Sequence, residues 1–77
     1  MPTVLRKSGF NFKINIHDHA PAHVHVWHQG QQVLINFEDV VSIRRNYGLS
    51  RNELRQALVI VREYQSFLQT KWREIHG

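Results

Sequence analysis

The 77-residue chain contains no cysteine, so no disulfide bond can hold its fold together. Small secreted domains usually depend on disulfides, and their absence favours a reducing, cytoplasmic location. No apolar run reaches the roughly 18 residues that a membrane-spanning helix requires, and the first residues lack the layout of a secretory signal peptide. We therefore expect one cytoplasmic domain over residues 1–77, with no membrane partner.

Acidic residues are few: six, against ten lysines and arginines, which gives a net charge of +4 with neutral histidines. A basic surface attracts phosphate groups or acidic proteins, so nucleic acid is one candidate partner. A domain of this length buries only roughly 60% of the surface that its unfolded chain exposes. Because such a domain is marginally stable alone, a partner protein or self-association would stabilise it.

The clearest strand signal runs from Phe10 to Ile16, where apolar and polar residues alternate strictly. This period of two predicts a half-buried strand with one wet face. We expect Thr3–Arg6 to form a shorter strand before it, and Gly9 permits a tight hairpin connection between the two. The N-terminal part of the chain is therefore predicted to form an antiparallel hairpin.

Two further strands are predicted over His23–His28 and Gln32–Phe37, each with apolar residues on one face. The segment from Phe37 to Tyr47 fits two structures, a short edge strand through Val40 and Val41 or a helical turn. The sheet is therefore expected to have three or four strands.

Ser50 and Glu53 match a capping box, in which each side chain bonds the backbone N–H of the other residue. No proline or glycine follows until Gly77, so we expect one long helix over about 51–75. Its apolar residues fall on one stripe, which is expected to cover the sheet. The stripe consists of Leu54, Ala57, Leu58, Val61, Tyr64, Leu68, Trp72 and Ile75.

Together these elements predict an α+β fold, in which a small antiparallel sheet of three or four strands packs against one long C-terminal helix. Residues 1–37 supply the sheet, residues 38–49 a connection and residues 50–76 the helix. The two hydrophobic periods predict one common core. Its expected members are Phe10, Phe12, Ile14, Val24, Val26, Leu58, Val61, Leu68 and Trp72.

Five of the six histidines lie between residues 17 and 28. Residues two apart on a strand share a face, so His23 and His25 are expected to point the same way and can ligate one ion. Strand parity adds His17 to that partly exposed outer face, with Asp18 and His19 at its rim. Imidazole suits zinc, nickel, copper or iron, and Asp18 offers an oxygen ligand. The cluster therefore predicts a site for a divalent transition metal such as zinc.

Other interpretations of this cluster stay open. The histidines can form a merely polar strand face, or they can bond the backbone around Pro21 in a structural loop. The same residues also suit a metal- or histidine-dependent nuclease or phosphohydrolase, because imidazole transfers protons near neutral pH. A His-x-His-x-His strand would resemble the histidine-triad nucleotide hydrolases, but Trp27 stands at the third position and argues against that class.

Basic residues gather on one flank of the predicted helix, within about 40° of one another, and two more precede it. They are predicted to bind phosphate, since arginine can hold a phosphate group through two parallel hydrogen bonds. The alternative is a solvated face whose long stems cover the edge of the core. The residues are Arg44, Arg45, Arg51, Arg55, Arg62 and Arg73.

Ile60 and Phe67 fall outside the main apolar stripe of the predicted helix, seven residues apart. Single apolar residues on a surface need no explanation, but a pair at this spacing suits contact with another helix. We therefore predict a partner interface at Ile60 and Phe67.

The stretch Asp18–Val26, which reads DHAPAHVHV, and the opening Met1–Arg6 resemble an uncharacterised bacterial family, numbered 4160 among the domains of unknown function. Gly48–Leu54 resembles the helix start of that family, and the likeness covers nearly the whole chain. Ala22 stands where the family often has a second proline. The resemblance implies a small protein encoded beside another small domain of unknown function, a setting typical of a toxin–antitoxin-like module. It transfers no catalytic residue.

The leading hypothesis is an interaction protein that forms one half of such a two-protein module. Its partner would be a small neighbour-encoded protein or a second copy of the chain. The nuclease or phosphohydrolase based on the histidine cluster is the alternative, and plain nucleic-acid binding through the arginines is the third.

Overall fold

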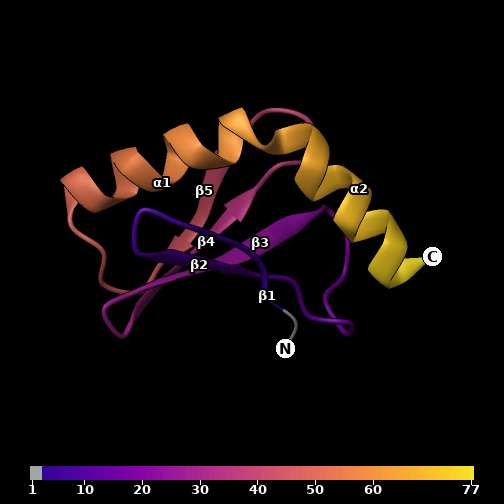
Figure 1. Cartoon of the computed structure of the whole chain (residues 1–77), viewed down its shortest axis with the longest axis horizontal. Helices are drawn as coiled ribbons and strands as arrows, with labels where there is room; N and C mark the ends of the chain where they lie inside the picture. Colours follow the sequence, from indigo (N-terminus) through magenta and orange to yellow (C-terminus); the bar gives the residue numbers. More distant parts are fainter. Residues whose placement is uncertain (1–2) are drawn as a thin grey trace.

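The computed structural model describes residues 3–77 as a five-stranded sheet and two helices (Figure 1). Each strand pairs antiparallel with the next along the chain. The elements are β1 (Thr3–Lys7), β2 (Phe10–Lys13), β3 (His23–His28), β4 (Gln31–Asn36), β5 (Ser42–Asn46), α1 (Arg51–Glu63) and α2 (Gln65–His76). The predicted α+β class with an antiparallel sheet is confirmed, but the numbers of strands and helices differ from the prediction. Within the described residues, neither helix has the length and apolarity to cross a membrane.

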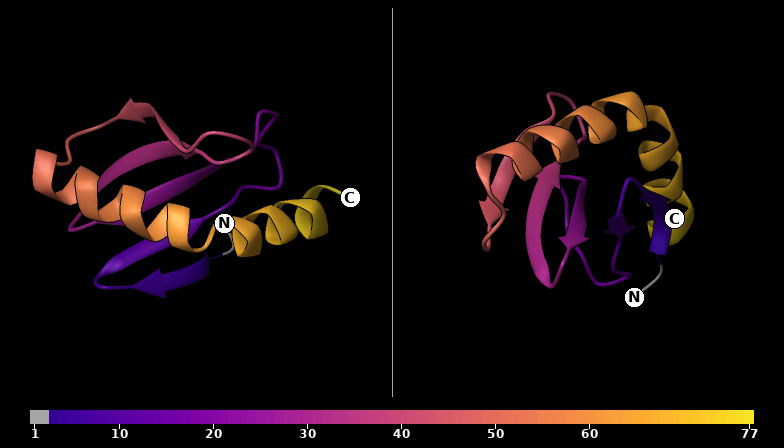
Figure 2. Two further views of the ribbon diagram at one scale, coloured as in Figure 1. Left: turned by 90° about the horizontal axis from the view of Figure 1, so that it is seen from above. Right: turned by 60° about the vertical axis from the view of Figure 1, so that its left-hand side comes forward.

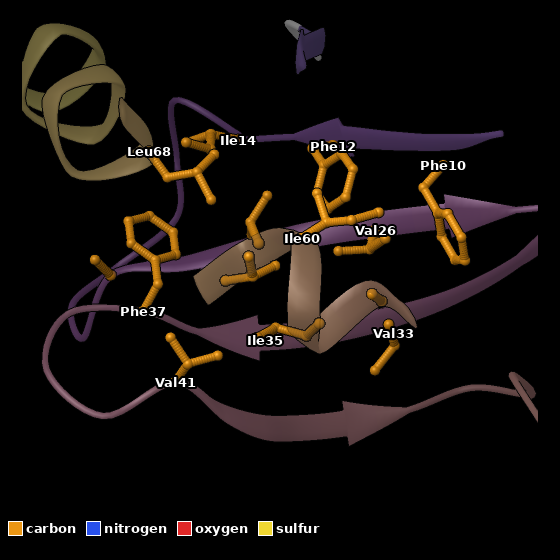
Figure 3. Packing of buried hydrophobic residues seen from close by; sticks show 14 of the residues in the cluster. Phe10, Phe12, Ile14, Val26, Val33, Ile35, Phe37, Val41, Ile60 and Leu68 are labelled. Carbon is orange, nitrogen blue, oxygen red and sulfur yellow. The ribbon is translucent and has the colours of Figure 1, made fainter. Parts of the chain in front are cut away.

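Both helices lie on the same side of the sheet, so only one sheet face is covered (Figures 1 and 2). Alternate residues of the central strands face the helices and are buried, as the period of two predicts (Figure 3). All but two of the predicted core residues are buried, and Leu58 and Trp72 pack against the core half-buried. The other sheet face, called the open face below, carries half-buried polar residues and Trp27.

Strand β2 is shorter than predicted and ends at Lys13 rather than at Ile16. Ile14 keeps its place in the core, but the chain then turns, and the Asp18 N–H donates to the Asn15 carbonyl at 3.1 Å. Ile16 is consequently 63% exposed. Ile16 lies in this turn but continues the apolar–polar alternation of β2 in the sequence. The alternation alone therefore could not show where the strand ends.

An edge strand forms within the segment predicted as a connection, residues 38–49, but it begins at Ser42, after Val40 and Val41. All five residues of β5 are exposed, so its sequence carries no hydrophobic alternation from which a strand could be recognised. Its pairing with β4 contains an irregularity of register. A bulged edge strand with charged residues resists pairing with other sheet edges.

The predicted single helix is wrong: it breaks at Tyr64, whose backbone (φ −106°, ψ 20°) ends α1 and precedes α2. A straight helix over 51–75 would span about 38 Å, more than the longest extent of the molecule, 33 Å. The bend keeps α2 on the fold and turns it over the end of the sheet (Figure 2). Gln65 Nε2 fixes the bend by donating to the carbonyls of Phe37 at 2.8 Å and Asp39 at 2.7 Å.

The bend also changes which helix face is buried. Helix α1 buries Ala57, Ile60 and Val61, whereas Leu58 is only half-buried. Ile60 was predicted to lie on an outer seam with Phe67, but it is a core residue with 6% exposure, so that prediction is wrong. The predicted apolar stripe assumed one straight helix. Because the helix breaks, α1 and α2 turn different faces toward the core than a single straight helix would. Phe67 is 39% exposed, as expected.

Replacing Ile60 by alanine is expected to lower the free energy of unfolding by about 2–4 kcal/mol, because it leaves a cavity in the core. Val59 provides a matched control, since it is the preceding residue, is also β-branched and is 51% exposed. Val59→Ala should change the free energy of unfolding by no more than about 0.5 kcal/mol. Urea unfolding measures both variants, and equal losses would contradict the burial of Ile60.

Ser50 caps α1 as the sequence predicts. Its hydroxyl accepts from the Glu53 N–H at 3.2 Å, and its own N–H donates to Glu53 Oε1 at 2.8 Å. The hydrogen bond from the Ser50 backbone N–H to the carboxylate, and after it the Ser50 side chain, hold the pKa of Glu53 below its ordinary value of 4.5, and the nearby His28 adds to the effect. The charged form of Glu53 therefore favours the folded state.

Because folding lowers the pKa of Glu53, its stabilising contribution is fully present above about pH 4.5 and is lost as the pH falls through the folded-state pKa. We expect the free-energy difference between the unaltered chain and Glu53→Gln to be largest near about pH 6 and to shrink toward about pH 3. Urea unfolding across this range measures it, with Glu63→Gln on the same helix as control. A difference that grows on acidification would refute the capping role of Glu53.

Candidate metal centre

The loop between β2 and β3 holds Asp18 against the start of β3. The Asn15 N–H donates to Asp18 Oδ2 at 3.1 Å, and the Asp18 N–H donates back to the Asn15 carbonyl, also at 3.1 Å. A carboxylate that bonds a nearby backbone N–H in this way closes a tight local turn. The chain passes Pro21 through a cis peptide bond and enters β3 at His23. The carboxylate of Asp18 is therefore fixed in place before any ligand binds.

Two imidazoles of β3 converge on this carboxylate. His25 Nε2 lies 3.0 Å from Asp18 Oδ2, and His23 Nε2 lies 3.6 Å from Asp18 Oδ1. One ligand atom from each of the three residues lies within 4.8 Å of the others. The three side chains are only 13%, 6% and 13% exposed, for Asp18, His23 and His25 in turn. The strand parity that paired His23 with His25 thus also brings both to Asp18.

The second nitrogen of each ring faces an oxygen acceptor. His23 Nδ1 lies 2.9 Å from the Pro21 carbonyl, and His25 Nδ1 lies 3.4 Å from Gln32 Oε1. A neutral imidazole has one N–H, so a proton donated from Nδ1 leaves a bare lone pair on Nε2. Both lone pairs then face the negatively charged Asp18, and the side-chain nitrogen of Asn15 lies 3.4 Å from His25 Nε2. In this tautomer a cation bound between the three groups, or a second proton on each ring, would supply the missing positive charge.

The donor set fits a transition-metal ion. Two bonds of about 2.0–2.1 Å at a tetrahedral angle place their donor atoms about 3.3 Å apart. The nitrogen–oxygen distances, 3.0 Å from His25 to Asp18 Oδ2 and 3.6 Å from His23 to Oδ1, lie on either side of that value, and the three ligand atoms lie within 4.8 Å of one another. Metal-bound histidines usually donate their other N–H to a carbonyl or carboxylate, the role that Pro21 and Gln32 fill here. Two imidazoles and one carboxylate suit zinc, and also iron, nickel or copper.

The C-terminal half of α2 closes one side of this centre. The ring of Trp72 lies 5.6 Å from that of His23 and 3.9 Å from that of His76. His76 Nε2 in turn lies 3.1 Å from the Asn15 carbonyl, which ties the helix to the loop that carries Asp18. The sequence interpretation missed His76, because it lies 61 positions from Asn15 and no local pattern links them.

The structure divides the predicted histidine cluster. His17 and His19 are exposed and lie outside the group formed by Asp18, His23 and His25. The expectation that His23 lies on a partly exposed face is also wrong, since only 5% of this residue is exposed. Its position at the beginning of β3 brings it under Trp72, and parity along one strand cannot reveal such a cover from a distant helix.

His28, at the other end of β3, has a structural role. Its ring stacks on Phe10 at 4.3 Å, and its Nδ1 donates to the Gly9 carbonyl at 3.1 Å. Its Nε2 lies 3.2 Å from Glu53 Oε2 at the start of α1. His28 therefore joins the β1–β2 hairpin to the first helix, far along β3 from the metal ligands.

The predicted phosphate-binding arginines are all exposed, which phosphate binding requires, but they occupy separate elements. Arg44 and Arg45 belong to β5, at the edge of the sheet. The others belong to the helices: Arg51, Arg55 and Arg62 to α1 and Arg73 to α2. Phosphate binding by these residues stays a prediction.

We expect the ring of His23 to carry its proton on Nδ1 in the neutral, metal-free protein, because Pro21 offers the nearer acceptor. Long-range ¹H–¹⁵N spectra of the imidazoles measure the tautomer. The ring of His17, which is exposed, serves as a reference in the same spectrum. A proton found on Nε2 of His23 with Nδ1 bare would show that the hydrogen bond to Pro21 does not form.

Comparison with known proteins gives one match. Residues 9–73 match the family described as a domain of unknown function, DUF4160. No curated protein and no solved structure matches the chain. The matched range contains the whole Asp18–His25 centre and most of both helices.

Proposed function

The chain belongs to the DUF4160 family, whose function is unknown, and from the geometry of its site we propose that it binds one divalent transition-metal ion through Asp18, His23 and His25. Zinc is the first choice among these metals, because its usual ligands are imidazole nitrogens and carboxylate oxygens at tetrahedral positions. The proposal concerns a resident metal ion. It favours the metal-dependent alternative of the sequence analysis over the interaction protein.

One observation carries this proposal: both Nε2 atoms point at one carboxylate while both Nδ1 atoms face oxygen acceptors. His28 also has an oxygen beside each ring nitrogen, the Gly9 carbonyl and Glu53 Oε2, but it is a single ring at its carboxylate. At Asp18, in contrast, two largely buried imidazoles share one carboxylate. A divalent ion between the three groups would supply positive charge to all of them.

Three protein ligands leave a fourth tetrahedral position for water or substrate, as in catalytic rather than structural zinc sites. A metal ion there would lower the pKa of a bound water and polarise a phosphoryl oxygen, which is the chemistry of hydrolysis. Neighbouring residues would orient the three ligands: Pro21 and Gln32 bond the rings of His23 and His25, and Asn15 bonds Asp18. Metal-dependent phosphate-ester hydrolysis is therefore the reaction class that this site supports best.

The hypothesis of an interaction protein in a toxin–antitoxin-like module has less structural support than the sequence suggested. Of the two residues proposed for a partner interface, Ile60 is in the core and Phe67 alone is exposed. Lys71 lies over the exposed ring of Phe67, with Nζ 5.5 Å from the ring centroid. A partner surface at Phe67 stays a proposal, and Val59 of α1, which is 51% exposed, is a second exposed apolar residue of the helices.

Titration with Co²⁺ and Zn²⁺ tests the metal site, because Co²⁺ bound by nitrogen and oxygen ligands gives a visible absorption spectrum. Asp18→Asn and His25→Ala are each expected to weaken metal binding by more than about 100-fold, since even the loss of an outer hydrogen-bond partner costs about 10–100-fold. The matched controls are His17→Ala and His19→Ala, which remove exposed imidazoles from the same loop. They should leave the affinity unchanged.

Circular dichroism of each variant shows whether the fold is kept. Asp18→Asn is the decisive variant, because it preserves the shape of the side chain and removes its charge. Weak metal binding that is equal in the unaltered chain, in Asp18→Asn and in the His17 and His19 variants would disprove the site. Those imidazoles would then act as structural groups.

A further inference from the structure

Charge is unevenly distributed over the fold. The five strands contain five lysines and arginines and no aspartate or glutamate. All six acidic residues of the chain lie in loops and helices. Because the helices cover one sheet face, cations of the strands that point away from the helices meet solvent on the open face. Register places three of the strand cations, Arg6, Lys13 and Arg45, on this open face, whereas Lys7 lies over Tyr64 on the helix side.

Strand pairing identifies the residues of this open face. One row runs across four strands as Lys13, His25, Leu34 and Arg45. The adjacent row contains Arg6, Asn11, Trp27 and Gln32, and the backbone of Tyr47 bonds that of Gln32 and extends the row past β5. With neighbouring strands about 4.8 Å apart, the two rows cross a surface about 19 Å wide.

Cations and aromatic rings are paired on this face. Lys13 Nζ lies 5.9 Å from the ring centroid of Trp27, and the guanidinium of Arg45 lies 5.0 Å from that of Tyr47. Tyr47 is 47% exposed, and Trp27 is half-buried. A flat ring beside a cation offers a stacking partner for a base and a charge for the adjoining phosphate.

We infer that the open face of the sheet binds single-stranded nucleic acid, with Arg6, Lys13 and Arg45 on the phosphates and Tyr47 and Trp27 beside the bases. An acidic protein would satisfy the cations as well, but the pairing of each ring with a cation matches the pairing of base and phosphate within a nucleotide. A duplex would require an element that enters a groove, and both helices lie on the opposite side of the sheet from these two rows (Figure 2). Aromatic residues on a bare sheet are a known platform for single strands.

This surface goes beyond the proposed metal site, because binding on it requires no metal ion. The two nevertheless meet at His25, which ligates in the proposed centre and stands in the first row directly opposite Lys13. A strand held on the open face would therefore bring its backbone to the edge of the metal centre. If both proposals hold, a nucleic-acid strand is the phosphate ester that the centre acts on.

The test uses fluorescein-labelled oligouridylate of about 12 nucleotides and fluorescence anisotropy with the metal-free, full-length chain. Two triple variants are compared: Arg6→Gln, Lys13→Gln and Arg45→Gln on the sheet, and Arg51→Gln, Arg55→Gln and Arg62→Gln on α1. Each lowers the net charge from +4 to +1, so the comparison separates position from total charge. Single-stranded DNA, duplex RNA and polyglutamate serve as further probes.

For the unaltered chain we expect affinity to fall about 20-fold between about 50 and about 200 mM salt if three phosphates are contacted, and the sheet variant should lose this dependence. The α1 variant should keep most of the affinity. Tyr47→Ala should weaken binding about 5- to 150-fold with little change in the salt dependence, because it removes stacking.

Each of four results would overturn the inference. The unaltered chain could fail to bind the oligonucleotide, or the two triple variants could weaken it equally. Duplex RNA could bind more tightly than the single strand, or polyglutamate could bind as tightly as RNA, which would assign the face to an acidic protein. The cobalt titration of the same variants is a separate readout, so a failure of nucleic-acid binding is distinguishable from a failure of the metal site.

Discussion

The burial of one face of a short sheet is the constraint on which the rest of the fold depends. Strands of four to six residues span only about 13–20 Å, and the apolar residues that they bury all point to one side. A helix long enough to hold all the remaining apolar residues cannot lie straight on so short a sheet. The helix therefore breaks at Tyr64. The break keeps Leu68 in the core and places Trp72 beside His23 at the start of β3.

The site follows from this bend. Because α2 turns over the end of the sheet, Trp72 covers His23 and His76 ties down the loop at Asn15. That loop holds Asp18 against two imidazoles that strand parity alone had placed together. Low exposure makes the electrostatics of the three groups matter, since a charge that faces few water molecules is screened weakly. A carboxylate and two ring nitrogens in such surroundings favour a cation as their common partner.

The same one-sided burial leaves the other sheet face bare, with Arg6, Lys13 and Arg45 on it and no acidic residue in its strands. Two cation–aromatic pairs on this face, Lys13 with Trp27 and Arg45 with Tyr47, each bridge the two adjacent rows. The proposed metal centre lies at the border of this face through His25, so the two proposed sites share one strand. A family of unknown function thus has a chemically consistent proposal: a strand of nucleic acid on the sheet and a metal ion at its edge.

By itself the sequence determined the features that depend on local periodicity and local hydrogen bonding. Alternation from Phe10 to Ile16 identified a half-buried strand, although β2 ends at Lys13. Ser50 and Glu53 identified the start of a helix, and the spacing of His23 and His25 placed two imidazoles side by side. The tertiary structure alone decided the break at Tyr64, the burial of Ile60, the exposed edge strand β5 and the approach of Asp18, rather than His17 or His19, to the two imidazoles. Each of these depends on contacts between distant segments, such as Gln65 with Phe37 and His76 with Asn15. The periodic pattern of one segment shows which of its faces is buried, but it does not show which other segment packs there.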